Sequence, residues 1–74
     1  MEQLQEFHVR IDNTFKIIIA YDSLQAIKEM IQHLKIYASM RSLVEIDSYI
    51  PGHTKYKLYG MDKMYFLEVW QELK

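Results

Sequence analysis

The sequence predicts a two-layer α+β domain in which four antiparallel strands form one sheet and two helices pack on one face of it. Two observations lead to this prediction. Apolar and polar residues alternate in two separate stretches, 7–19 and 43–59, a pattern typical of hairpins. After each stretch, apolar residues recur three or four positions apart, as on one face of a helix. The expected order is therefore ββαββα, with residues 1–74 as a single domain and residues 1–5 as a frayed end.

The first hairpin is expected in the segment EFHVRIDNTFKIIIAY. A three-residue loop, 12–14, pairs Ile11 with Phe15 and places the alternating apolar residues of both strands on one face. A two-residue loop would instead set apolar residues opposite polar ones. Because Ile18 makes the second strand apolar on both faces, we expect this strand in the interior of the sheet.

A helix is expected from about Ser23 to Ser39. Asp22 can cap its first turn, with Gln25 three residues later in a capping-box pattern. One face of this helix carries the apolar residues Leu24, Ile27, Met30, Ile31, Leu34, Tyr37 and Ala38. An earlier end near Lys35 is the alternative, and it would turn Ile36 back into the core.

The second hairpin is expected in SYIPGHTKYKLYG. Pro51-Gly52 is turn chemistry, because proline presets φ and glycine accepts a positive φ at the next position. A three-residue loop from Pro51 to His53 gives chemically sensible pairs on both faces. The pairs of this register are Ile50 with Thr54, Ser48 with Tyr56, Ile46 with Leu58, Asp47 with Lys57 and Tyr49 with Lys55.

The C-terminal segment MDKMYFLEVWQELK predicts a second helix. Asp62 can cap it, and Phe66, Val69, Trp70 and Leu73 form a helical stripe. A fifth strand through KMYFLEVW is the alternative, because aromatic and β-branched residues also favour strands.

Composition and charge limit the classes of function. The net charge is −1, whereas a general polyanion-binding protein carries a basic excess. The chain has no cysteine, and neither a signal peptide nor a membrane span is expected. These features favour the cytoplasm. Nine isoleucines against three alanines are typical of an AT-rich genome, such as that of a low-GC bacterium or its phage.

No constellation of residues predicts an enzyme, a cofactor or a metal site. His8, His33 and His53 fall on a strand, a helix and a turn, so we expect solvated histidines and not a zinc site. Glu45 and Asp47 share a strand face, and we expect them to form cross-strand ion pairs with the lysines opposite.

One face of the predicted sheet could bind nucleic acid. Its outward positions carry the basic and aromatic side chains Arg10, Lys16, Lys55, Lys57, Tyr49 and Tyr59. Some RNA-binding modules stack bases on such a sheet. Acidic residues on the same face argue against this function, and it is the alternative hypothesis.

The favoured function is protein–protein contact by a small, non-enzymatic regulator, inhibitor or adaptor that forms a homodimer. Its six tyrosines support this class, since tyrosine is enriched at interfaces. The expected contact surface is the outer side of the two helices. It comprises Ile36, Met40, Met64, Tyr65 and His33, because adaptable methionines are frequent at binding surfaces.

Overall fold

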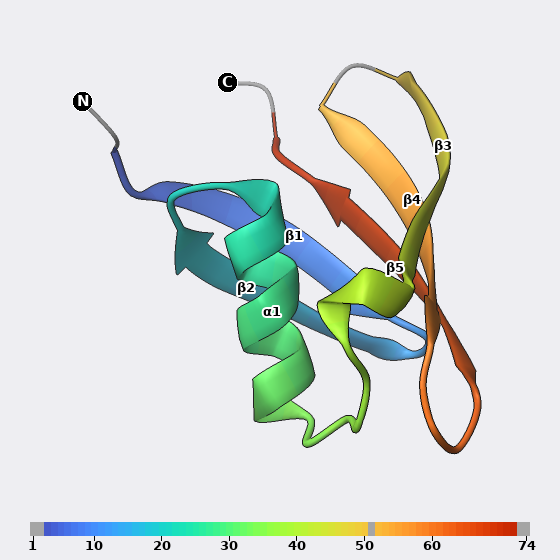
Figure 1. Cartoon of the computed structure of the whole chain (residues 1–74). Helices are drawn as coiled ribbons and strands as arrows, with labels where there is room; N and C mark the ends of the chain where they lie inside the picture. The colour runs from blue at the N-terminus through green and yellow to red at the C-terminus, as the bar shows by residue number, and fades with distance from the viewer. Residues whose placement is uncertain (1–2, 51, 73–74) are drawn as a thin grey trace.

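The computed structural model describes residues 3–50 and 52–72, without the side chains of residues 47–50, and shows a five-stranded antiparallel sheet with one α-helix. The elements are β1 (Gln5–Ile11), β2 (Thr14–Ala20), α1 (Ser23–His33), the 3₁₀ helix η1 (Met40–Ser42), β3 (Leu43–Ile50), β4 (His53–Tyr59) and β5 (Met64–Trp70). The strand order is β2-β1-β5-β4-β3 (Figure 1). The predicted α+β class is therefore confirmed, whereas the prediction of four strands and two helices is wrong.

The C-terminal segment is the central strand β5, and the prediction of a second helix here is wrong. Tyr65, Leu67 and Val69 are buried at alternate positions, which is the period of a strand. β5 pairs with β1 on one side and with β4 on the other, so its backbone is bonded along both edges. Asp62 does not cap a helix, because a strand follows it. Its carboxylate instead accepts hydrogen bonds of 2.8 and 3.0 Å from the Tyr65 hydroxyl.

The β1–β2 hairpin closes with the two-residue turn Asp12-Asn13, so the predicted three-residue loop is wrong. Ile11 pairs with Thr14, and the register continues from there without a shift. The pairing moves every side chain of β2 to the face opposite the expected one. β2 also forms an edge of the sheet and not its interior.

Asp12 explains why this turn is stable. Its φ of 51° is a left-handed conformation that aspartate tolerates better than most residues. Its backbone N–H donates to the Phe66 carbonyl at 2.9 Å, and its carboxylate accepts from the Phe66 N–H at 3.1 Å and from Lys63 Nζ at 2.8 Å. The turn is thus anchored to β5, a partner that local sequence patterns do not reveal.

α1 begins where the sequence predicts and ends earlier. The Asp22 carboxylate accepts from the Gln25 N–H at 2.8 Å, which confirms the N-cap. The last helical residue is His33, and Lys35 adopts a φ of 56°. The Ile36 N–H donates to the Ile31 carbonyl at 3.1 Å, which is the longer bond of a Schellman motif. A lysine in place of the usual glycine conceals this stop signal.

The early helix end returns the chain to the core, as in the alternative interpretation. Ile36 and Met40 are partly buried and pack against the core cluster, so neither points outward from a long helix. Leu24 and Tyr37, both expected in the buried stripe of the helix, are exposed. No helix in the part of the chain that the structure describes is long and apolar enough to cross a membrane.

The β3–β4 hairpin has a different register from the predicted one. Ile50 pairs with His53, so His53 begins β4 and is not a loop residue. Gly52 has a φ of 77°, as expected for turn chemistry, whereas Pro51 and the side chains of residues 47–50 lie outside the described part. The register shifts on both sides of Asp47, which is the mark of β-bulges or similar irregularities.

The bulged register changes the partners of the β3 residues. Glu45 lies opposite Tyr56 on the face covered by the helix, and Asp47 lies opposite Lys55 instead of Lys57. The expected cross-strand ion pair of Glu45 with a lysine is therefore wrong. Burial and then the Glu45 carboxylate raise the pKa of the Tyr56 phenol.

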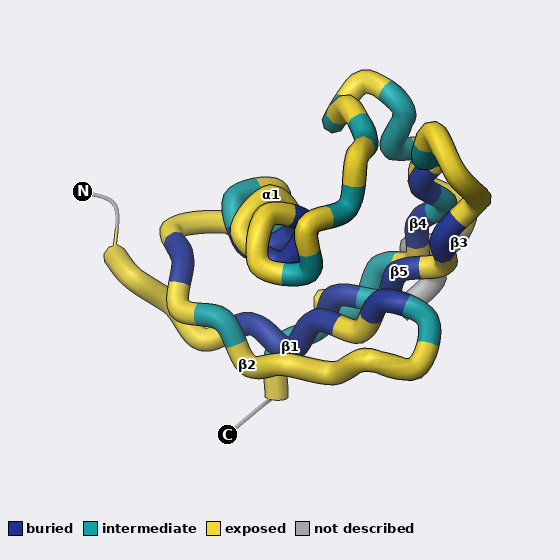
Figure 2. Tube along the Cα trace, turned by 90° about the horizontal axis from the view of Figure 1, so that it is seen from below, coloured by how far each residue is buried: buried dark blue, intermediate teal, exposed yellow. Residues whose placement is uncertain are grey.

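The core lies between α1, η1 and one face of the sheet. Its members are Phe7, Val9, Ile11, Ala20, Ala26, Ile27, Met30, Ile31, Tyr56, Leu58, Tyr65, Leu67 and Val69. Figure 2 shows α1 on one side of the sheet and buried residues along β1, β4 and β5, while β2 is largely exposed. We call the covered side the inner face and the opposite side the outer face.

Replacing Leu67 by alanine is expected to lower the free energy of unfolding by about 2–5 kcal/mol, because Leu67 is 1% exposed in the central strand. The matched control is Phe66→Ala, one residue away on the outer face. It should cost about 1 kcal/mol or less, because the Phe66 side chain is 51% exposed. Urea unfolding followed by circular dichroism measures both. A larger cost for Phe66 than for Leu67 would indicate the helical arrangement instead.

Acid should weaken the anchor between Asp12 and β5. The hydrogen bond from Lys63 lowers the pKa of Asp12, and the Phe66 N–H adds to this effect. The carboxylate therefore stabilises the folded state above about pH 4, and this contribution is lost as the pH falls through the lowered pKa.

Asp12→Asn is expected to reduce stability near neutral pH and to flatten its decline below about pH 4. Asparagine tolerates the same backbone conformation, so the turn itself is kept. Lys63→Met should act in the same direction, because it removes the main cause of the lowered pKa. Urea midpoints measured from neutral to acid pH test this, and an unchanged acid profile in both variants contradicts it.

Candidate interaction surface on the outer face of the sheet

α1 and η1 cover only the inner face, and the outer face has no second layer in the described structure (Figure 2). Strand alternation assigns the side chains of the outer face. They are Glu6, His8 and Arg10 of β1; Phe15, Ile17 and Ile19 of β2; Met64, Phe66, Glu68 and Trp70 of β5; His53, Lys55, Lys57 and Tyr59 of β4; and Val44 of β3.

Several large apolar side chains are exposed on this open face. Phe15, Ile17 and Ile19 are 47%, 51% and 53% exposed, and Phe66 is 51% exposed. More than half of the exposed large apolar residues that the structure describes lie here. An antiparallel sheet with one face in water usually carries polar residues on that face. A large apolar patch on a soluble domain marks an interaction surface.

Trp70 is the centre of an aromatic cluster on the outer face. Its ring lies 5.5 Å from His8, 5.7 Å from Phe15 and 5.4 Å from His53, measured between centroids, and the Arg10 guanidinium carbon lies 5.8 Å from it. These spacings are those of favourable aromatic pairs. The cluster covers His8, which is only 7% exposed, so the prediction of a solvated histidine at this position is wrong.

Glu68 is the acidic residue around which the basic side chains beside the aromatic cluster are arranged. Its carboxylate lies 2.9 Å from His53 Nε2 and 3.7 Å from Arg10, and Lys55 is its partner on β4 in the register. Lys57 has a less polar environment than Lys55, because its neighbours on β3 and β5 are the apolar Val44 and Phe66. The outer face therefore carries a charged row, formed by Arg10, Glu68 and Lys55, across β1, β5 and β4. Exposed apolar side chains lie on β2 and around Phe66.

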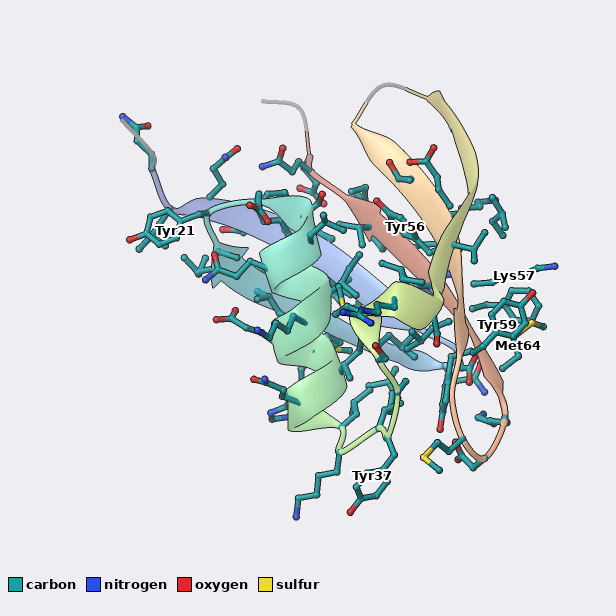
Figure 3. The ribbon with its side chains drawn as sticks, viewed as in Figure 1. Tyr21, Tyr37, Tyr56, Lys57, Tyr59 and Met64 are labelled. Carbon is teal, nitrogen blue, oxygen red and sulfur yellow. The ribbon has the colours of Figure 1, made fainter. Side chains whose placement is uncertain are left out.

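The structure brings together most residues of the predicted basic and aromatic face. Arg10, Lys55, Lys57 and Tyr59 lie on the outer face, and Figure 3 shows Lys57 and Tyr59 turned away from α1. Lys16 does not join them. It pairs with Val9, so it lies on the inner-face side of β2, beside a groove of about 280 Å³. Tyr49 lies outside the described side chains.

The predicted contact surface on the helices is not formed as expected. Tyr65 is buried on β5, and Ile36 and Met40 pack against the core. Met64 is on the outer face of the sheet, next to Tyr59 (Figure 3), and His33 is exposed in the last turn of α1. The five residues are therefore spread over different surfaces.

Sequence reasoning missed the contribution of β2 and the aromatic cluster. The available signal is that β2 is apolar on both faces, a pattern that also predicts an interior position. An edge strand whose outer side chains form an interface gives the same pattern. The sequence pattern predicts a helix at Trp70, and a helix gives no indication that Trp70 lies beside His8 and His53.

Neither a metal site nor a known relative assigns a role to this surface. Among the side chains that the structure describes, no group of three or more His, Asp or Glu is arranged to hold a metal ion. No protein-family model, no curated protein and no solved structure matches this chain. The surface itself is therefore the basis for inferring a function.

Proposed function

We propose that this chain is a small, non-enzymatic cytoplasmic protein that binds another protein through the outer face of its sheet, as a regulator, inhibitor or adaptor. The observation that supports this most is the set of exposed apolar side chains on β2 and β5, Phe15, Ile17, Ile19 and Phe66, on the face of the sheet that has no second layer in the described structure. Aromatic residues and arginine at the centre of a patch are typical of interface hot spots.

The chemistry of the outer face suggests what the partner surface contains. Apolar side chains of the partner would cover Phe66 and Ile17, both about half exposed. A carboxylate of the partner would face Lys57, whose ammonium lies 6.0 Å from the Phe66 ring centroid and has apolar neighbours on both adjacent strands. Such a charge at the rim contributes more to specificity and association rate than to affinity.

Nucleic-acid binding is the alternative, supported by the same cluster of aromatic rings and basic side chains. Bases can stack on exposed aromatic rings of a sheet. However, the Glu68 carboxylate lies beside the cluster and already binds Arg10 and His53. It would repel a phosphate backbone, so we favour a protein partner.

Phe66→Glu is expected to weaken partner binding at least about tenfold, because it replaces a large apolar side chain of the proposed contact, 51% exposed, by a charge. The matched control is Met61→Glu, which alters a residue that is 91% exposed in the loop between β4 and β5. Affinity capture with mass spectrometry should find proteins that bind wild type and Met61→Glu but not Phe66→Glu. Circular dichroism must show both variants folded. Equal capture by all three proteins argues against this surface.

Titration with labelled single-stranded RNA and DNA at low salt separates the two functions. Fluorescence anisotropy is expected to show no saturable binding at micromolar protein. Micromolar affinity that falls steeply with salt and disappears in a Lys55→Ala/Lys57→Ala variant would establish the alternative.

A further inference from the structure

The two edges of the sheet differ in how they are protected against pairing with another strand. β3, one edge, carries two register shifts around Asp47. β2, the other edge, pairs with β1 over all seven of its residues without a shift. Bulges, prolines and charges are the devices that block an edge. β2 contains no bulge and no proline, and its only charged residue is Lys16.

The register shows which backbone groups of β2 face outward. Ile11 and Thr14 flank a two-residue turn, so they form a hydrogen-bonded pair, and such pairs recur at every second residue. The Asp12 N–H, one residue on, donates to β5 instead, as this alternation requires. The N–H and C=O groups of Phe15, Ile17 and Ile19 therefore point away from β1, toward the free edge.

We propose that β2 pairs with β2 of a second copy of this chain, antiparallel and about a two-fold axis at Ile17. Ile17 then lies opposite the partner's Ile17, and Phe15 lies opposite the partner's Ile19. This register uses all the outward backbone groups of both strands and gives about six hydrogen bonds. The two five-stranded sheets become one continuous sheet.

Side chains on the outer face fit this register. Phe15 and the partner's Ile19 form an aromatic–β-branched cross-strand pair, which is among the favourable pairs in sheets. Two such pairs flank the contact between the two Ile17 side chains. All three residues are about half exposed in the single chain, and the pairing explains why an edge strand carries apolar side chains on its open face.

The inner-face side of β2 supplies complementary charge. Lys16 and Glu29 both line the groove of about 280 Å³ between β2 and α1, together with Ile18 and His33. In the proposed register, Lys16 lies opposite the partner's Ile18 and can reach the partner's Glu29. The two-fold axis repeats this ion pair, so the surface is self-complementary, as an isologous interface requires.

This pairing uses the edge of the sheet, so it goes beyond the proposed contact at the outer face and is tested separately. Sedimentation equilibrium from about 1 to 300 μM, where typical self-association is resolved, is expected to show a monomer–dimer equilibrium for the wild type. Phe66→Glu should leave it unchanged. Loss of partner capture with an intact dimer, or the reverse, distinguishes the two proposals.

Ile17→Pro is expected to make the protein monomeric over the same range. Proline removes an N–H that faces the free edge and leaves the β1–β2 ladder intact, which is why proline is tolerated in edge strands. If this variant does not fold, Lys16→Glu tests the same interface at an exposed residue. It should weaken dimerisation about tenfold, and Lys16→Glu/Glu29→Lys should restore it.

Hydrogen exchange identifies the strand that pairs. The amides of Phe15, Ile17 and Ile19 should exchange at least about tenfold more slowly in the dimer than in the diluted monomer, because they become hydrogen-bonded. A monomer at every concentration would overturn the proposal. A dimer in which these three amides exchange rapidly, or a charge swap that fails to restore association, would also overturn it.

Discussion

The position of β5 between β1 and β4 is the constraint on which the rest of the structure depends. The hairpins β1–β2 and β3–β4 each leave an open edge, and β5 satisfies the backbone groups of both. An isolated hairpin is at best marginally stable in water. The buried Leu67 and Val69 and the anchor of Asp12 to Phe66 then join the N-terminal and C-terminal strands in one core. The residues that pair between β1 and β5 are separated by most of the sequence. Bringing these two strands together is therefore the entropically costly step of folding.

The single helix accounts for the asymmetry of the sheet. Five strands at about 4.8 Å spacing are wider than one helix of about 10 Å, so α1 covers β1 and β2 while the segment through Ile36 and Met40 covers the rest of the inner face. No residues remain in the described part to cover the outer face. The apolar side chains of the outer face are not needed for the core, which lies on the inner face. They therefore remain available to contact a partner.

β2 connects the two proposed interfaces. Its odd-numbered residues direct their side chains to the outer face and their backbone groups to the free edge. Pairing of two copies through this edge would continue the outer face from one copy to the next. A partner with two matching surfaces would then bind with an avidity that a single copy does not provide. The two functions thus reinforce each other. They share Ile17, whereas Phe66 belongs to the outer-face contact alone.

The sequence by itself determined the α+β class, the existence of both hairpins and the start of α1 at Asp22, because these depend on alternation, turn residues and capping within a few positions. Only the tertiary structure decided the rest. The local pattern of MYFLEVW favours a helix, with a strand as the alternative, and the open edges of β1 and β4 selected the strand. Lys35 carries no stop signal, yet packing of Ile36 against the core ends the helix. Phe15, Ile17 and Ile19 face outward because the bonds between Asp12 and β5 favour a two-residue turn, and a change of one residue in a turn exchanges the two faces of a strand.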